Sequence, residues 1–133
     1  MDAGTGSGIL AMVALRLGAA SALGIDNDAV ALQCAREYAA ANAFGPEIDL
    51  RVASLQDLGS EKFDVIAANL DGETLLRLSA ALRDRMRTEG IGCLSGVQKE
   101  DYEEIAGALA NEGWNIRAQV ERNGWLALEV KSA

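Results

Sequence analysis

The feature that most constrains the fold is a regular alternation of short apolar segments with helical segments. Apolar side chains spaced three or four residues apart predict four helices, at residues 9–17, 29–42, 73–87 and 100–111. Short apolar or alternating runs predict strands at residues 21–26, 48–53, 63–68 and 91–96. Such alternation is typical of a parallel sheet with helices on both faces, because each right-handed crossover lays its helix against the sheet.

The last part of the chain departs from this pattern. Residues 114–122 and 125–131 both resemble strands, and Asn123-Gly124 separates them. This dipeptide tolerates the positive φ angles of a type I′ turn, so it predicts an antiparallel hairpin. The predicted fold class is therefore α/β, doubly wound and mostly parallel, with a C-terminal antiparallel hairpin. The length of 133 residues suits a single domain, residues 1–133.

Composition narrows the function classes. The absence of histidine excludes Ser-His-Asp and Cys-His nucleophilic sites. A net charge of -8 disfavours direct nucleic-acid binding and favours a basic protein partner. No apolar run approaches the roughly 20 residues needed to span a bilayer, and no signal peptide is evident, so we expect a cytoplasmic protein without membrane contact.

The two cysteines do not indicate a metal site or a disulfide. Cys34 and Cys93 stand far apart, form no CxxC pair and have no histidine to join them. We expect no metal, and we expect both thiols to be small buried or half-buried side chains.

The first candidate site is the glycine-rich segment Asp2-Ala3-Gly4-Thr5-Gly6-Ser7-Gly8. Its three glycines alternate between a strand end and a helix start, where backbone can approach a ligand and helix N-terminal amides point at it. The spacing is GxGxG and not the GxGxxG dinucleotide fingerprint, which weakens a pyrophosphate interpretation. The alternative is a tight structural turn.

The second candidate is Asp26, which lies 22 residues after Gly4 and ends the next strand. Its carboxylate can accept hydrogen bonds from both ribose hydroxyls of a nucleoside cofactor. We place Asn27 in the same site, whereas Asp28 is better explained as the N-cap of the following helix. The alternative for Asp26 is also a helix-capping role.

Two further strand ends supply candidates at the carboxyl edge of the predicted sheet. Ser54 or Leu55 follows the third strand, where the adenine ring of a nucleoside would lie; the alternative is a strand-end loop, and Asp57 is ambiguous for the same reason. Asn69 ends the fourth strand, where substrates bind in open α/β sheets. We take Asn69 as the candidate for holding the substrate, the alternative being a loop-capping asparagine.

Five segments in order resemble the catalytic domain of the bacterial ribosomal protein lysine methyltransferases that modify the eleventh large-subunit protein. They are Asp2 to Leu10, Gly24-Ile25-Asp26, Ala68-Asn69-Leu70, Leu94-Ser95-Gly96 and Gly124-Trp125-Leu126-Ala127-Leu128. The similarity runs over essentially the whole chain. The first two segments are shared with the wider class of S-adenosylmethionine enzymes, and only the later ones point to the narrower family.

The resemblance implies a Rossmann-like class I methyltransferase with a seven-stranded sheet whose last strand is reversed. It implies S-adenosylmethionine as cofactor, S-adenosylhomocysteine as product, and a protein amine, on a ribosomal protein for instance, as acceptor near Asn69. The expected cofactor-binding residues are Asp2, Gly4, Thr5, Gly6, Gly8, Asp26, Asn27, Ser54, Leu55 and Asn69, with Asn69 also catalytic. Leu70-Asp71 stand where methylases of DNA adenine or glutamine carry two prolines, which disfavours those substrates.

In that family a short apolar strand precedes the position of Asp2, and a helix and a substrate-recruiting domain come before it. Loss of a central strand would leave backbone groups of its neighbours unpaired, so we expect a homo-oligomer or a distorted sheet. One alternative function is a catalytically inactive fragment that serves as an assembly or interaction module. Another is a small-molecule methyltransferase, which would need a substrate lid.

Overall fold

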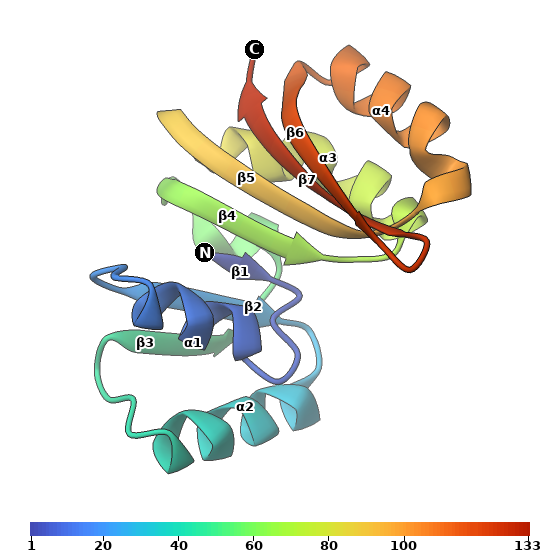
Figure 1. Cartoon of the computed structure of the whole chain (residues 1–133). Coiled ribbons are helices and arrows are strands. Elements are labelled where there is room, and N and C mark those ends of the chain that lie inside the picture. The colour runs from blue at the N-terminus through green and yellow to red at the C-terminus, as the bar shows by residue number, and fades with distance from the viewer. The chain divides into compact units, whose positions relative to one another are not determined.

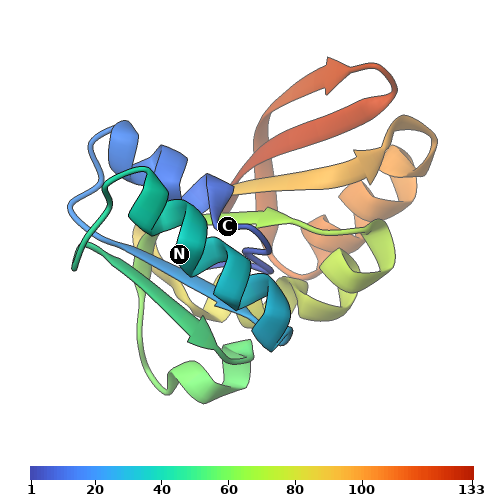
Figure 2. The same cartoon turned by 90° about the horizontal axis from the view of Figure 1, so that it is seen from below.

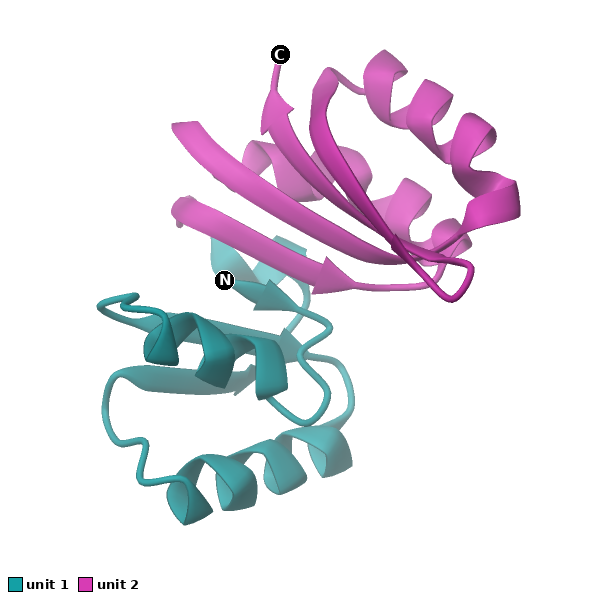
Figure 3. Cartoon of the chain, viewed as in Figure 1, with its two compact units in different colours: residues 1–59 teal, residues 60–133 magenta.

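The predicted alternation of strands and helices is present along the chain (Figure 1). The computed structural model describes residues 1–133, which divide into unit 1, residues 1–59, and unit 2, residues 60–133 (Figure 3). A single domain stays a prediction. No α-helix combines the length and the apolar character that crossing a membrane requires.

Unit 1 is a small parallel sheet with two crossover helices. Its elements are β1 (Asp2–Ala3), α1 (Ile9–Arg16), β2 (Ala22–Asp26), α2 (Ala29–Ala41), β3 (Ile48–Val52) and the 3₁₀ helix η1 (Leu55–Leu58). The strands lie in the order β3-β2-β1, and both pairs are parallel. Helices α1 and α2 each contact β2 and β3 (Figure 2). The strand expected to begin the sheet has two residues here, and homo-oligomerisation stays a prediction.

Local sequence explains where the helices of unit 1 begin and end. The Asp28 carboxylate accepts a hydrogen bond from the Val30 amide at 2.8 Å and caps α2 as predicted. Helix α1 ends before Gly18, which has a φ of 104°, an angle that glycine adopts without strain. Glycine is needed at position 24 in β2 for a different reason: a Cβ there would lie 2.8 Å from both Leu50 Cδ2 and Thr5 Oγ1. Glycine therefore lets the loop after β1 pack closely on β2.

Unit 2 combines a parallel strand pair with the predicted hairpin. Its elements are β4 (Phe63–Asn69), α3 (Gly72–Asp84), β5 (Met86–Gln98), the 3₁₀ helix η2 (Lys99–Asp101), α4 (Tyr102–Asn111), β6 (Trp114–Arg122) and β7 (Trp125–Ser132). The strand order is β4-β5-β7-β6, with β4 parallel to β5 and β7 antiparallel to both neighbours. Asn123 and Gly124 have φ angles of 52° and 81°, which confirms the predicted turn.

Unit 2 buries one face of its sheet. Ile66, Leu94 and Leu128 are 0%, 0% and 1% exposed, whereas Val65 and Ala127, at alternate positions of the same strands, are exposed. Helices α3 and α4 contact each other and β5, and they contribute fully buried leucines to the same core. Each buried leucine or isoleucine contributes about 1.5–3 kcal/mol. Within unit 2, the opposite face of the sheet carries no helix.

Two expected boundaries are wrong. Helix α3 ends at Asp84 and not at residue 87, and β5 starts at Met86 and not at residue 91. Met86 pairs with Phe63, and the Phe63 amide donates to the Arg85 carbonyl at 2.8 Å, so pairing with β4 extends the strand backwards. Met86 is buried, and a buried methionine suits a helix as well as a strand, so its side chain alone does not distinguish the two.

The expectation for the cysteines is also wrong. Cys34 and Cys93 are both exposed. Cys34 follows the fully buried Leu32 by two residues on α2, which turns it away from the core. Cys93 points to the face of the unit 2 sheet opposite Leu94, because side chains alternate along a strand.

Candidate functional site

The glycine-rich loop of unit 1 requires its glycines. Gly4, Gly6 and Gly8 have φ angles of 71°, 52° and 79°, a region that side chains with a Cβ rarely enter. The amides of Gly4 and Thr5 both donate to the Ile25 carbonyl at 2.9 Å, which ties the loop to the end of β2. A Cβ at Gly6 would meet no atom within 4 Å, so the backbone of the loop is open to an approaching ligand there.

The structure brings Asp26 to this loop. One carboxylate oxygen of Asp26 accepts from the Gly6 amide at 2.9 Å, and the other accepts from the Asp28 amide at 3.0 Å. A carboxylate offers about four lone-pair directions, so both oxygens keep acceptor capacity for the hydroxyls of a ligand. The predicted closeness of Asp26 to the loop is confirmed; contact of one ligand with both stays a prediction.

Hydrogen bonds of Asp2 and Thr5 stabilise the conformation of the loop. Asp2 is 3% exposed, and one of its oxygens accepts from Thr5 Oγ1 at 2.6 Å and from the Ala11 amide at 3.1 Å. Burial raises the pKa of Asp2 above its ordinary value, although the bonds from Thr5 and Ala11 act in the opposite direction. These contacts join the loop to α1; direct contact of Asp2 and Thr5 with a cofactor stays a prediction.

The raised pKa of Asp2 predicts a pH-dependent contribution to stability. Where the folded pKa lies above the unfolded one, the folded state binds more protons, so stability falls as the pH rises from about 4 through the folded pKa. Asp2→Asn removes this titration. We expect the free energy of unfolding of the unmodified chain, relative to Asp2→Asn, to be larger near pH 4 than near pH 7 in urea denaturation. If the free energy of unfolding of the unmodified chain, relative to Asp2→Asn, instead increased with pH, a raised pKa for Asp2 would be contradicted.

The residues after β3 lie near Asp26, but the polar groups of Ser54 already form hydrogen bonds to Asp57. The Ala53 amide donates to the Asp26 carbonyl at 3.0 Å. Ser54 Oγ and the Ser54 amide donate to Asp57 Oδ2 at 2.6 and 2.7 Å, forming a capping box at η1, and these bonds lower the pKa of Asp57. Asp57 is therefore a capping residue. Contacts of Ser54 and of the buried Leu55 with an adenine ring stay predictions, as does a role for the exposed Asn27.

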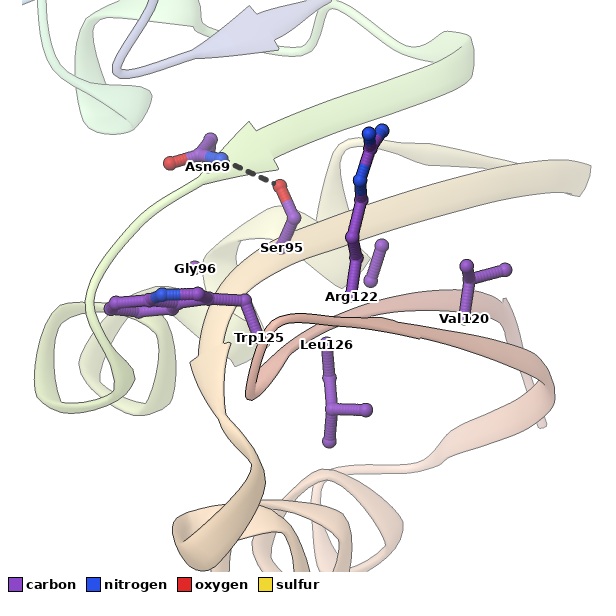
Figure 4. Close-up of a pocket in the computed structure, with 8 residues that line it drawn as sticks. Asn69, Ser95, Gly96, Val120, Arg122, Trp125 and Leu126 are labelled. Carbon is purple, nitrogen blue, oxygen red and sulfur yellow. Dashed lines mark hydrogen bonds between the residues drawn. The ribbon is translucent and has the colours of Figure 1, made fainter.

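In unit 2, Asn69 lies in a pocket on the uncovered face of the sheet. The Asn69 side-chain amide donates to Ser95 Oγ at 2.9 Å (Figure 4). Strand pairing places Asn69, Ser95, Ala127 and Val120 in one row across β4, β5, β7 and β6. The pocket has a volume of about 390 Å³. It is lined by Asn69, Ser95, Gly96, Val120, Arg122, Trp125, Leu126 and Ala127.

Sequence reasoning missed the hairpin side of this pocket. Arg122 and Trp125 flank the turn at residues 123–124 and pair with each other, so they lie on the same face of the sheet. In Figure 4, Asn69 and Arg122 lie on either side of Ser95. The signal that could have found them was the type I′ turn itself, since it sets the register in which these two residues pair.

Solved structures share this fold. The ribosomal protein L11 methylase of Lactobacillus delbrueckii subsp. bulgaricus matches 98% of this chain and 67% of its own, with a TM-score of 0.92 and 35% identity. The magnesium protoporphyrin IX methyltransferase of Synechocystis PCC 6803 matches 99% of this chain and 68% of its own, with a TM-score of 0.79 and 20% identity. The predicted Rossmann-like methyltransferase fold is therefore confirmed: seven strands, mostly parallel, with β7 antiparallel.

Sequence comparison points to one family within this fold. The family model for "Ribosomal protein L11 methyltransferase (PrmA)" matches residues 1–133. The ribosomal protein L11 methyltransferases of Dictyoglomus turgidum and Chromohalobacter salexigens are 34% and 37% identical to it, over 99% of the chain in each case. The chain spans less than half of either relative, 44% of each. By its sequence and by its fold, the chain belongs to the ribosomal protein L11 methyltransferase family.

Proposed function

We propose that the protein to which this chain belongs transfers a methyl group from S-adenosylmethionine to an amine of a protein substrate. The observation that carries the proposal is the contact between the Gly6 amide and the Asp26 carboxylate, at 2.9 Å. It unites an open, glycine-lined loop with an acceptor for ribose hydroxyls, the two groups that a nucleoside cofactor needs. Ribosomal protein L11 is the substrate after which the relatives are named, and it would place the reaction in the cytoplasm.

The residues of unit 1 fit the cofactor. The open position at Gly6 admits a ligand against the loop backbone, and the Asp26 oxygens retain lone pairs for the 2′- and 3′-hydroxyls. When bound, S-adenosylmethionine supplies a methyl group on a positively charged sulfur, which an amine nitrogen can attack directly. Displacement of this kind needs alignment and an unprotonated amine, and it needs no histidine.

Asn69 is suited to orient the amine. Its Nδ2 donates to Ser95 Oγ, so its Oδ1 remains available to accept an N–H from the substrate. A hydrogen bond from the amine to Oδ1 would direct the nitrogen lone pair away from Asn69. Methylation would place positive charge on the amine nitrogen, and Asn69 Oδ1 would stabilise that charge by accepting its N–H. Excess protons then pass to water.

The proposal is tested first by calorimetry with S-adenosylhomocysteine, which binds without any acceptor. We expect saturable heat with one site per chain. No heat at millimolar ligand would refute the cofactor site and would favour an inactive assembly module. The whole protein, with L11 as substrate, then tests the transfer itself by incorporation of a labelled methyl group.

We expect Asn69→Ala to lower kcat about tenfold, the worth of one neutral hydrogen bond of up to roughly 1.5 kcal/mol. The affinity of Asn69→Ala for S-adenosylhomocysteine checks that the cofactor site is intact. If Asn69 acts only on the acceptor amine, this affinity is unchanged. Ser95→Ala is the matched variant: it keeps Oδ1 but frees the amide to rotate, so a smaller loss is expected. Equal kcat in Asn69→Ala and the unmodified enzyme would contradict the assignment.

A further inference from the structure

The pocket around Asn69 contains one charged side chain, and that charge has no partner. Arg122 lines the pocket from β6, and its guanidinium forms no hydrogen bond and no ion pair. The neighbouring Glu121 points to the opposite face of the hairpin and pairs with Lys99 Nζ at 2.8 Å. An unpaired guanidinium beside a binding pocket acts on any ionisable ligand that enters it.

The other lining groups do not offset this charge. Asn69 and Ser95 are neutral and bonded to each other, and the remaining lining residues are apolar or glycine. Other titratable groups share the open face on β7 and β5. Glu129 and Lys131 stand two and four positions beyond Ala127 in β7; Cys93 of β5 pairs with Glu129, and Glu89 of β5 forms an ion pair with Lys131 at 3.9 Å. None of these groups lines the pocket.

The nearest acid in sequence to Asn69 is also engaged elsewhere. Asp71 accepts from the Thr74 amide at 2.9 Å and caps α3. The pocket therefore offers a bound amine a cation in its wall and no carboxylate. This is the opposite of the acidic, aromatic cages that hold alkylammonium groups in their charged form.

We infer that Arg122 sets the protonation state of the acceptor, admitting the amine to this pocket in its neutral form. The inference rests on the proposed function, because it assumes that the amine binds beside Asn69. An alkylamine titrates near pH 10.4, so most of it is protonated at neutral pH and lacks the lone pair that forms the N–C bond. Repulsion between like charges lowers the amine pKa in the pocket, and the released proton goes to water.

Binding of small molecules to the pocket tests the effect of ligand charge separately from that of ligand shape, and it requires no turnover. We would titrate n-butylamine and 1-butanol, a cation and a neutral molecule of similar size, against the chain near pH 8. The readout is the indole N–H signal of Trp125 in a proton–nitrogen correlation spectrum. Trp114, which is 3% exposed and donates to the Ser79 carbonyl, is the internal control and should not shift.

We expect Arg122→Gln to strengthen n-butylamine binding about tenfold, the equivalent of one pKa unit, and to change 1-butanol binding less than about twofold. Arg122→Lys keeps the charge and should behave as the unmodified chain. Equal or weaker n-butylamine binding in Arg122→Gln would overturn the inference while leaving the methyltransferase proposal intact. If neither probe shifts Trp125, the acceptor site itself is wrong.

Butyrate tests whether Arg122 binds a carboxylate instead of lowering the pKa of an amine. If Arg122 instead binds a carboxylate of the substrate, butyrate will bind more tightly than 1-butanol, and Arg122→Gln will abolish that advantage; this result would overturn the inference. In the whole enzyme, the apparent pKa of the kcat profile should rise by about one unit in Arg122→Gln and stay in place in Arg122→Lys. A raised KM with an unmoved profile would again indicate carboxylate binding.

Discussion

Asp26→Ala is expected to weaken binding of S-adenosylhomocysteine by about 1.5 to 3 kcal/mol, or roughly 10- to 150-fold in Kd. The carboxylate would accept hydrogen bonds from the ribose hydroxyls, and bonds to a charged acceptor are among the stronger ones. Its removal also leaves the Gly6 amide without the partner it has at 2.9 Å, so the loop loses part of its orientation. Isothermal titration calorimetry measures both affinity and stoichiometry.

Two variants separate these contributions. Asp26→Asn keeps one carbonyl oxygen for the Gly6 amide but has no charge, and it should give an intermediate affinity. Asp28→Ala is the matched control, since Asp28 lies two residues away and caps α2 through the Val30 amide. We expect it to lower helix stability and to leave the affinity nearly unchanged. Unaltered binding in Asp26→Ala would refute the ribose assignment.

Gly96→Ala is expected to destabilise the chain by at least about 2 kcal/mol. Gly96 has a φ of 89° and lies where the pairing of β5 with β7 shifts register between Ser95 and Val97. A Cβ at this position would overlap the backbone of Leu70, whose amide donates to the Ser95 carbonyl at 3.0 Å. Backbone cannot give way as a flexible side chain does, so the end of β4 must move.

The same displacement should impair the pocket, because Asn69 precedes Leu70 and bonds to Ser95. Urea denaturation measures the loss of stability, and n-butylamine binding measures the loss of the pocket. Gly107→Ala is the matched control. Gly107 lies inside α4, where the methyl carbon of an alanine would meet no atom within 4 Å, and the substitution should stabilise by about 0.5–1 kcal/mol. Similar effects of the two substitutions would contradict this account of Gly96.

Much of the architecture was predictable because it depends on residues close together in the sequence. The cap at Asp28, the glycines that end α1 and α4, and the turn at residues 123–124 all act within a few residues. The positive φ angles of the glycine-rich loop follow the same logic. The position of Asp26 beside that loop was also predictable, since both follow adjacent parallel strands.

Other features depend on which strands pair and in what register. Met86 became strand because Phe63 pairs with it, and Cys93 is exposed because no helix of unit 2 covers its face. Ser54 bonds to Asp57, a contact that the sequence analysis did not predict. Each outcome depends on a contact whose partners the local pattern does not identify.

The amino-acid sequence by itself therefore determined the order of strands and helices, the turn chemistry and the approach of Asp26 to the glycine-rich loop. Only the tertiary structure decided that Asn69, Ser95, Val120 and Arg122 share one pocket. These residues come from three separate strands, and a strand pairing one residue out of register would turn each side chain to the opposite face.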